Sequence, residues 1–513
     1  MRSRNIGGLV LGVFPVLVVV GLSAAAPGAE RATLADAAER RDTARVRTLL
    51  DTGADVNAVQ IDGTTALHWA AYHDDAETAA WLVRAGANVN AVNRYGVSPL
   101  SLACSNGSGA IAKLLLDRGA DANTTMKGGE TVLMMAARSG NLEAVNALLA
   151  RVVSGTALMW AAAEGHAAVV RALIDARADI NATLDSGLTP FFFAVRDGHI
   201  DAVRAFLDAG VDVNATTERR ERTPGSPALY KPVIKGTSPL LLAVQNGHFE
   251  LAIALVDAGA DPNDQRTGFT PLHTLTWVRK PDSSDVSEPP PGGSGRITSL
   301  QFVREIVKRG ADVNRRLDKG APKVPNTSSR IGSEGATPFL FAADRSDVPL
   351  MRLLVELGAD PLLPNFNNTT PLMAAAGLGT TEPLEEAGEE PEAVEAVKML
   401  IDLGADVNAV DNNGDTAMHG AAYGNYPLVV KLLAERGANP QIWKERNKQG
   451  VTPLFAAEGH IGRLPRPDPP TIAAVTRLML AAGLSTEGKR PTVVDIYEKP
   501  AAAPQKLVKP EQR

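Results

Sequence analysis

A motif of about 33 residues is repeated along most of this 513-residue chain. Its clearest copy is residues 64–96, in which Leu67 of the segment ALHWAA anchors the alignment. Successive anchors are most often 33 residues apart; one spacing is shortened to 25, and most of the others are lengthened by insertions. A fixed period of this length predicts a stack of similar units, each covering its apolar side against the next. The twelve anchors are Leu34, Leu67, Leu100, Leu133, Leu158, Phe191, Leu240, Leu272, Phe339, Leu372, Met418 and Leu454.

Each copy carries the signals of two short helices joined by a turn. Thr65 can cap the first helix with its hydroxyl, and in seven copies a proline follows where a helix tolerates the missing N–H. The second helix has apolar residues at helical spacing and ends at a glycine such as Gly86, which can adopt a left-handed conformation. Asp and Asn residues and a second glycine, Gly96, then favour a tight turn.

The recurring tetrapeptides and the period point to one family. Residues 65–68 read TALH, residues 270–273 read TPLH, and GADVNA occurs at 53–58 and 404–409. In these motifs the chain resembles the ankyrin repeat family. The resemblance implies an all-α repeat fold, an ankyrin solenoid of about twelve helix-turn-helix units with β-turn fingers over residues 30–484. It also implies a protein partner, bound on the concave face of first helices and fingers.

The first 29 residues differ from the repeats. Arg2 and Arg4 precede an apolar run of 17 residues that is interrupted by Pro15 and followed by small residues. This order predicts a signal peptide, residues 1–29, and export to the periplasm or the extracellular space. The alternative is an uncleaved anchor, for which the run is short. We expect no stable membrane span after cleavage, a monomer, and a poorly ordered tail over residues 485–513.

Charge and cysteine content limit the kinds of partner the chain can bind and the compartments in which it can be stable. The formal net charge is −6, which disfavours nucleic acid, because its binding depends chiefly on Lys and Arg at the phosphates. The single cysteine, Cys104, lies in a slot that small alanines fill in other copies, so we expect it to be buried. No intrachain disulfide is possible, and an exported chain of this kind must be held together by its stacked core.

Insertions distinguish the second half of the chain from the first. We expect them to form loops that are either functional or disordered. Those placed in fingers should project on the finger side of the stack, and those placed between helices should project from the opposite end. The fourth repeat is instead shortened, and its finger should be absent or vestigial. The insertions are residues 216–235, 279–298, 318–335, 380–392 and 462–470.

The residues give no signature of catalysis or of a cofactor. Seven of the eight histidines occupy slots of the repeat pattern, and only His73 is off pattern. The resemblance implies structural hydrogen bonds between repeats for the histidine after the anchor, as at His68. The aspartates of the GAD slot should stabilise turns. The GGSGR segment at 292–296 has no strand before it, which favours a flexible linker over a phosphate-binding loop. We therefore predict no catalytic, cofactor-binding or metal-binding residue.

Partner contacts are expected where the repeat pattern requires no particular residue and the side chain points outward. Two places satisfy this condition: the end of each first helix and the finger tips. Tyrosine and arginine are frequent interface anchors, so the second repeat is the strongest local candidate. The predicted partner-binding residues are Tyr72, His73, Asn93, Arg94, Tyr95, Arg138, Glu164, Arg196, Asp197, Gln245 and Tyr423.

Two classes of function fit these observations. The first, which we favour, is a non-enzymatic scaffold that binds a protein in the bacterial periplasm or extracellular space. The second is an accessory or inhibitor subunit of a specific enzyme, or a metal or redox site built from the inserted loops. Insertions that fold together into a pocket with converging carboxylates would favour the second class, and separate, mobile loops the first.

Overall fold

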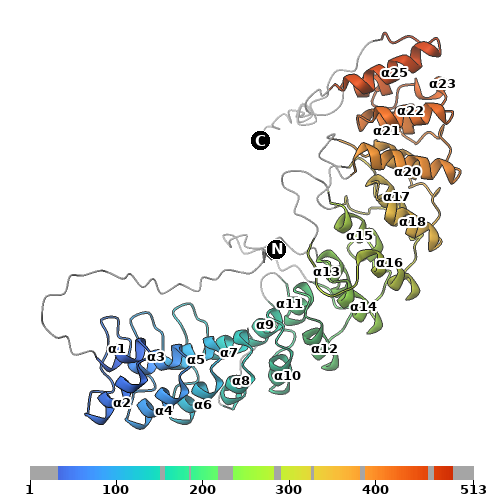
Figure 1. Ribbon diagram of the computed structural model, residues 1–513. Coiled ribbons are helices and arrows are strands. Elements are labelled where there is room, and N and C mark those ends of the chain that lie inside the picture. The colour runs from blue at the N-terminus through green and yellow to red at the C-terminus, as the bar shows by residue number, and fades with distance from the viewer. Residues whose placement is uncertain are drawn as a thin grey trace, which may run out of the picture. The chain divides into compact units, whose positions relative to one another are not determined.

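The computed structural model describes residues 33–150, 156–183, 187–217, 235–281, 291–324, 329–381, 388–459 and 467–488 (Figure 1). In these ranges the regular elements are helices, accompanied by two isolated β-bridges. The helices form twelve pairs, which confirms the predicted all-α repeat fold. The proposed signal peptide, the vestigial finger at 151–155, His460 and the central parts of most insertions lie outside the described residues.

The chain divides into two compact units, and the first of them ends at Asp121. It contains three repeats, in which first helices pack on first helices and second helices on second helices. The anchors Leu34, Leu67 and Leu100 are buried between them. The helices of this unit are α1 (Leu34–Glu39), α2 (Thr43–Asp51), α3 (Ala66–Tyr72), α4 (Ala76–Arg84), α5 (Pro99–Asn106) and α6 (Gly109–Asp117).

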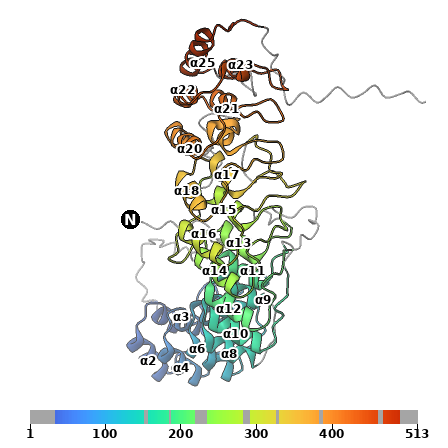
Figure 2. The same ribbon diagram turned by 90° about the vertical axis from the view of Figure 1, so that its right-hand side faces the viewer.

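The second unit begins at Ala122 and contains nine further pairs. In the upper part of Figure 2 its second helices lie on the left, its first helices in the middle and its finger loops on the right. The elements are α7 (Val132–Ser139), α8 (Leu142–Leu149), α9 (Thr156–Ala163), α10 (Ala167–Asp175), α11 (Pro190–Arg196), α12 (Ile200–Asp208), α13 (Pro239–Gln245), α14 (Phe249–Asp257), α15 (Pro271–Arg279), α16 (Ser299–Lys308), α17 (Pro338–Asp344), α18 (Val348–Glu356), α19 (Pro371–Met373), η1 (Ala374–Leu378), α20 (Glu390–Asp402), α21 (Ala417–Tyr423), α22 (Pro427–Glu435), α23 (Pro440–Trp443), α24 (Pro453–Ala457) and α25 (Pro469–Ala481).

The helices begin and end where the local signals predict. The Thr65 hydroxyl accepts a hydrogen bond from the His68 N–H at the start of α3, as a cap should. Thr337 caps α17 in the same way, with Pro338 in the first turn. The second helix α4 is followed by Gly86 at a φ of +92°, a conformation that glycine adopts without steric penalty.

In six of the described fingers an asparagine links one repeat to the next. In the first unit, the Asn57 amide donates to the Gly86 carbonyl at 3.3 Å, and its oxygen accepts from the Asn88 N–H at 2.7 Å. Asn90 makes the same pair of bonds to the following repeat. Leu362 occupies this slot after the ninth repeat, between the linked positions of Asn314 and Asn408. We call this series the asparagine ladder; its members are Asn57, Asn90, Asn214, Asn263, Asn314 and Asn408.

The tenth repeat departs from the regular unit. Its first helix changes from α19 into the single π-turn η1, in which Gly377 has a φ of +98°. A Cβ atom at Gly420 of α21 would lie only 2.8 Å from the Leu378 nitrogen. The wide turn and these two glycines therefore allow the first helices of the tenth and eleventh repeats to approach closely.

Candidate protein-binding surface

The first finger is a tight turn over residues 60–63. The Gln60 N–H donates to the Thr64 carbonyl at 2.9 Å, and Gly63 closes the turn with a φ of +86°. The second finger, residues 93–96, repeats this arrangement one period later, with a φ of +80° at Gly96. The turn residues at the end of each repeat thus produce the projecting fingers that the sequence predicts.

The two fingers contact each other at their tips. The Arg94 N–H donates to the Asp62 carbonyl at 2.9 Å, and the Asn93 amide reaches the Thr64 hydroxyl at 3.3 Å. A Cβ atom at Gly63 would lie 3.3 Å from the Asn93 Cα. The fingers are therefore in register, and side chains one period apart lie next to each other.

This register gathers exposed apolar side chains along the two fingers. Val59 and Ile61 flank Gln60, whose side chain accepts from the Trp69 indole of α3, and both remain exposed. Ile61 is fully exposed and Tyr95 is 54% exposed. We call Val59, Ile61, Val92, Arg94 and Tyr95 the finger edge. Large exposed apolar side chains that cluster in this way mark interaction surfaces.

A second group lies at the end of α3. Tyr72 is 50% exposed and meets the Trp69 ring edge-to-face at 5.7 Å between centroids. His73 stacks on the other part of Trp69 at 5.8 Å, and its Nε2 donates to the Glu39 carbonyl at 2.9 Å. The Trp69 indole N–H donates to Gln60 at 2.8 Å. We call Trp69, Tyr72 and His73 the helix-end cluster, and together with the finger edge it forms the repeat-two surface.

Trp69 was missed by the sequence reasoning. It follows His68 in the first helix, at a position where other copies carry Leu102 or Trp160, and the repeat pattern requires no particular residue there. That freedom is the signal that could have found it. Its partly exposed ring holds the two predicted residues Tyr72 and His73 in place, and it belongs to the candidate surface on that ground.

In the second unit the predicted residues form smaller groups. Arg138 lies over the Trp160 ring at 5.5 Å and pairs with Glu130 at 2.7 Å. Arg196 lies over Phe193 at 4.7 Å and makes a two-pronged ion pair with Asp197. Glu164 is exposed at the end of α9, and Gln245 is half-buried at the end of α13. These side chains occupy the predicted places at the helix ends, and the two arginines already have partners within the chain.

Three predicted contact residues have structural roles that the sequence reasoning did not foresee. The Tyr423 side chain is only 5% exposed: its hydroxyl donates to Asp415 at 3.3 Å and accepts from Asn447 at 3.0 Å. The expectation that it points outward is wrong. Asn93 accepts from two backbone N–H groups of its own turn. His73 lies outside the histidine slots of the repeat pattern, but like the histidines in those slots it bonds to a neighbouring repeat, through the Glu39 carbonyl.

Six of the seven histidines in the described residues bond to carbonyls of neighbouring repeats, as the resemblance implies for His68 and His273. Nε2 of His68 donates to Val97 at 3.0 Å, and Nε2 of His273 donates to Ala336 at 3.2 Å. Burial lowers the pKa of His273 to about 3 and that of His419 to about 4. His166, His199 and His248 reach back from the turn to a carbonyl at the end of the preceding first helix. These hydrogen-bonded rings hold repeats together.

Groups suited to metal or redox chemistry do not gather in the part of the chain that the structure describes. No set of three or more His, Cys, Asp or Glu side chains is placed there to hold a metal ion. Cys104 is buried, and burial raises the pKa of its thiol to about 12, so it is not a thiolate near neutral pH. The described helices are also too short or too polar to traverse a bilayer.

The described flanks of three insertions meet at the turn of the ninth repeat. Arg345 donates to the carbonyl of Lys280, from the insertion in the eighth repeat, and Lys280 pairs with Glu392, beside the insertion in the tenth. The Arg330 N–H, from the lengthened finger, donates to the Gly379 carbonyl at 2.9 Å. The expectation that finger and inter-helix insertions project from opposite ends is therefore wrong here, because the long finger folds back over the first helices.

The glycine-rich segment at 292–296 is packed rather than free. A Cβ atom at Gly293 would lie 2.2 Å from the Gly247 carbonyl oxygen. The Ser294 hydroxyl donates to the Gly198 carbonyl at 3.2 Å, and the Arg296 N–H donates to Glu250 at 2.9 Å. We call residues 291–296 the glycine clasp. It spans the turns of the sixth and seventh repeats, and its interpretation as a flexible linker is wrong.

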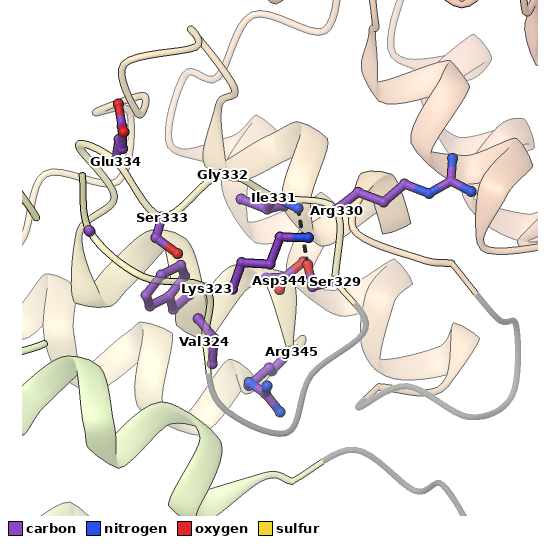
Figure 3. A pocket seen from close by; sticks show the side chains of 12 residues that line it. Lys323, Val324, Ser329, Arg330, Ile331, Gly332, Ser333, Glu334, Asp344 and Arg345 are labelled. Carbon is purple, nitrogen blue, oxygen red and sulfur yellow. Dashed lines mark hydrogen bonds between the residues drawn. The ribbon is translucent and has the colours of Figure 1, made fainter. Parts of the chain in front are cut away.

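A cavity of about 300 Å³ lies between the lengthened finger and α17 (Figure 3). Its apolar wall includes Val324, Ile331 and Phe341, and Ser333 and Asp344 contribute polar atoms. In Figure 3 the Arg330 side chain extends away from this cavity. Two carboxylates, Glu334 and Asp344, are among its lining residues, and Figure 3 draws them apart from each other. They therefore do not converge as the carboxylates of an enzyme-like pocket would need to.

Comparison with known proteins identifies the repeats. A family model described as "Ankyrin repeats (3 copies)" matches residues 34–126, 75–155, 133–217 and 384–463, which together make up more than half of the chain. A model described as "Ankyrin repeat" matches residues 235–266.

Similar regions occur in otherwise different proteins. "Ankyrin repeat and SOCS box protein 6" of Pongo abelii is 33% identical over 122 residues, covering 23% of this chain and 26% of that protein. "Ankyrin repeat and SAM domain-containing protein 6" of Rattus norvegicus is 29% identical over 180 residues, covering 33% and 17%. "Putative ankyrin repeat protein L86" of Acanthamoeba polyphaga mimivirus is 28% identical over 142 residues, covering 25% and 24%. The matched region thus spans about a quarter or less of each relative's length.

Proposed function

Since this chain belongs to the ankyrin repeat family, we propose that it is a non-enzymatic binding protein that holds a partner protein on its repeat-two surface. Ankyrin repeats in general mediate protein–protein interaction, and the fold alone does not choose the partner. The site for the partner must therefore be argued from the exposed side chains of this chain.

One observation carries the proposal. Five of the twelve large apolar side chains that are exposed in the described residues lie on the first two fingers and the end of α3. Arg94 stacks on Tyr95 at 5.4 Å between its guanidinium carbon and the ring centroid. Tyrosine and arginine are enriched among the side chains that dominate binding energy when a partner covers them, and clustered exposed apolar side chains mark interaction surfaces. The partner then presents an apolar patch with a carboxylate or carbonyl oxygen opposite Arg94.

The compartment is part of the proposal. The basic, apolar and small-residue order of residues 1–29 supports export to a bacterial periplasm or the extracellular space. A buried single cysteine is compatible with an oxidising compartment, because it has no second thiol to pair with. We propose that the exported chain acts as a monomer.

Affinity capture tests the binding site. The exported form is immobilised and exposed to envelope extract, and the bound proteins are identified by mass spectrometry. A Tyr72→Ala/Arg94→Ala/Tyr95→Ala variant should lose the captured partner. Leu480→Ser, which removes an exposed apolar side chain on α25, should retain it. With the purified partner, each single change at a true anchor should weaken binding by about tenfold or more. Equal capture by the triple variant and the wild type would refute the site.

The meeting of insertions at the ninth repeat favours one alternative. It resembles the arrangement expected of an accessory or inhibitor subunit, because the described flanks fold together instead of standing apart. If the captured partner is an enzyme, its rate should change when this chain is added. Substitution of Arg345 should alter this change in rate. The Tyr72→Ala/Arg94→Ala/Tyr95→Ala variant should abolish the change, because it no longer binds the partner. An unchanged rate would leave only the scaffold role.

A further inference from the structure

The lengthened finger lays a short stretch of its own chain across three repeats. We call residues 329–333, Ser-Arg-Ile-Gly-Ser, the covering segment. Ile331 packs against the buried cluster that includes Phe341 of α17, in the ninth repeat. The Gly332 carbonyl accepts from the Asn365 amide at 3.0 Å, from the finger that follows. The segment is thus held by both an apolar and a polar contact.

The segment continues to the tenth and eleventh repeats. The Arg330 N–H donates to the Gly379 carbonyl at 2.9 Å, directly after η1. The Arg330 guanidinium carbon lies 5.1 Å from the Tyr423 ring centroid, over α21. Figure 3 shows this side chain leaving the cavity toward the neighbouring helices. Tyr423 therefore meets an arginine from its own chain on the face where the sequence predicts a partner.

The segment does not fill the space beneath it. The cavity of about 300 Å³ remains between Ile331 and the wall formed by Phe341 and Val324. An unfilled space forfeits the dispersion contacts that a larger side chain would make. A ligand with a bulkier apolar residue at the Ile331 position would pack better than the segment itself.

From these contacts we infer that the first helices of repeats nine to eleven form a second protein-binding face, which takes an extended peptide carrying an arginine followed by a bulky apolar residue, and that the covering segment occupies this face in cis. The arginine stacks on Tyr423, the backbone N–H bonds to Gly379, and the apolar residue enters the cavity beside Phe341. A partner segment must displace residues 329–333 to bind. This face is separate from the repeat-two surface and lies within the second unit.

Displacement by a partner is measurable because the covering segment competes intramolecularly. A tethered segment acts at an effective concentration in the millimolar range, so a free peptide should bind the wild type weakly. Replacing the tethered arginine and isoleucine removes the segment's contacts with Tyr423 and the apolar cluster and leaves its two backbone hydrogen bonds. Arg330 is exposed, so Arg330→Ala alone leaves the apolar cluster intact.

The experiment uses the full chain and a fluorescein-labelled peptide with the sequence of residues 329–335. Anisotropy titrations should show saturable binding to an Arg330→Ala/Ile331→Ser variant that is at least tenfold tighter than binding to the wild type, with Arg330→Ala intermediate. A peptide with Phe at the Ile331 position should bind tighter still. A peptide with both Arg and Ile replaced by Ala and Ser should not saturate.

The outcomes distinguish binding at this face from binding at the repeat-two surface. Binding of the peptide to the Arg330→Ala/Ile331→Ser variant should persist when Tyr72→Ala/Arg94→Ala/Tyr95→Ala is added, because Tyr72, Arg94 and Tyr95 are in the first unit. Equal, unsaturated binding to the wild type, Arg330→Ala and the double variant would overturn the inference. If the double variant does not fold, Arg330→Ala decides the matter: no gain in affinity over the wild type overturns it.

Discussion

The second repeat and the ninth to eleventh repeats have the same helix-turn-helix plan, but the ends of their first helices differ in exposure to solvent. In the second repeat, Tyr72 and the fingers are open to solvent, and Arg94 stacks on a tyrosine of its own finger. In the later repeats, an insertion brings Arg330 onto Tyr423 and covers the equivalent helix end. An insertion can therefore convert an exposed helix end into an internal contact without changing the repeat.

The largest expected loss of stability concerns an ion pair in the later repeats, where the insertions occur. Arg279 and Asp347 form a two-pronged ion pair at 2.8 and 3.1 Å, with side chains 16% and 5% exposed, and Asp347 also caps α18. Asp347→Ala leaves Arg279 without this partner and should destabilise the second unit by about 3–4 kcal/mol. Urea unfolding followed by peptide-resolved hydrogen exchange measures it.

The matched control for this change is Asp201→Ala. The Arg204–Asp201 pair is exposed on α12, and such pairs contribute little, so the loss should stay below about 1 kcal/mol. Similar losses for the two variants would contradict the view that the later repeats depend on their internal charges.

Acid should weaken the repeats through their buried histidines. His273 is fully buried and its pKa falls from 6.5 to about 3 on folding. Its contribution is present above pH 6.5 and is lost as the pH falls from 6.5 toward 3, because only the unfolded form takes up the proton readily. His273→Gln should therefore remove about 2 kcal/mol of the stability difference between pH 8 and pH 5. Denaturant midpoints at both pH values provide the measurement, and an unchanged difference would contradict the assignment.

The asparagine ladder can be tested in both directions, by removing a link from the first unit and by adding one to the second. Asn57→Ala removes two hydrogen bonds from the first unit and should cost about 1–2 kcal/mol. Leu362→Asn supplies the residue that the same slot carries elsewhere, and it replaces an exposed leucine. It should stabilise the second unit by about 0.5–1 kcal/mol. Thermal unfolding of both variants gives the signs, and a loss of stability in the second variant would show that the link cannot form there.

The smallest expected effect concerns the glycine clasp. Gly293→Ala introduces a Cβ atom against the Gly247 carbonyl at a φ of +58°, whereas a Cβ atom at Gly292 meets nothing within 4 Å. Gly293→Ala should raise hydrogen exchange in residues 291–296 and at the turn of the seventh repeat. The global loss should be about 1 kcal/mol or less, because the clasp can open locally without unfolding the helices. Gly292→Ala should leave exchange unchanged, and equal exchange in both variants would mean that the clasp is not packed.

The sequence predicts what depends on neighbouring residues. The Thr65 cap, the proline at the start of α17 and the buried anchors follow from local rules and from the period. The position of the repeat-two residues follows from the same register. The role of Asn57 was also within reach, because GADVNA recurs; a role in the turn was predicted for its Asp and Asn, but not that Asn57 links two repeats.

What the sequence does not predict depends on contacts between distant segments. Tyr423 has the expected place at the end of α21, yet its exposure is decided by Arg330, Asp415 and Asn447. Nothing in the composition of the lengthened finger indicates that it turns back over the first helices. The clasp likewise depends on the absence of a side chain at Gly247, which lies 46 residues before Gly293 in the chain.

The asparagine ladder also determines how the second unit would carry tension. Each rung joins one finger to the next, so a pulling force on the fingers passes from repeat to repeat in series through these amides. At Leu362 the ladder has no rung, and the neighbouring fingers are joined there by other amide contacts, from Asn367 and Asn368 to Asp411 and Asn412. The second helices of the same two repeats are also joined by the exposed Arg352–Glu395 pair. Salt would weaken this ion pair and leave the amide contacts unaffected, so part of the mechanical strength of the junction depends on ionic strength.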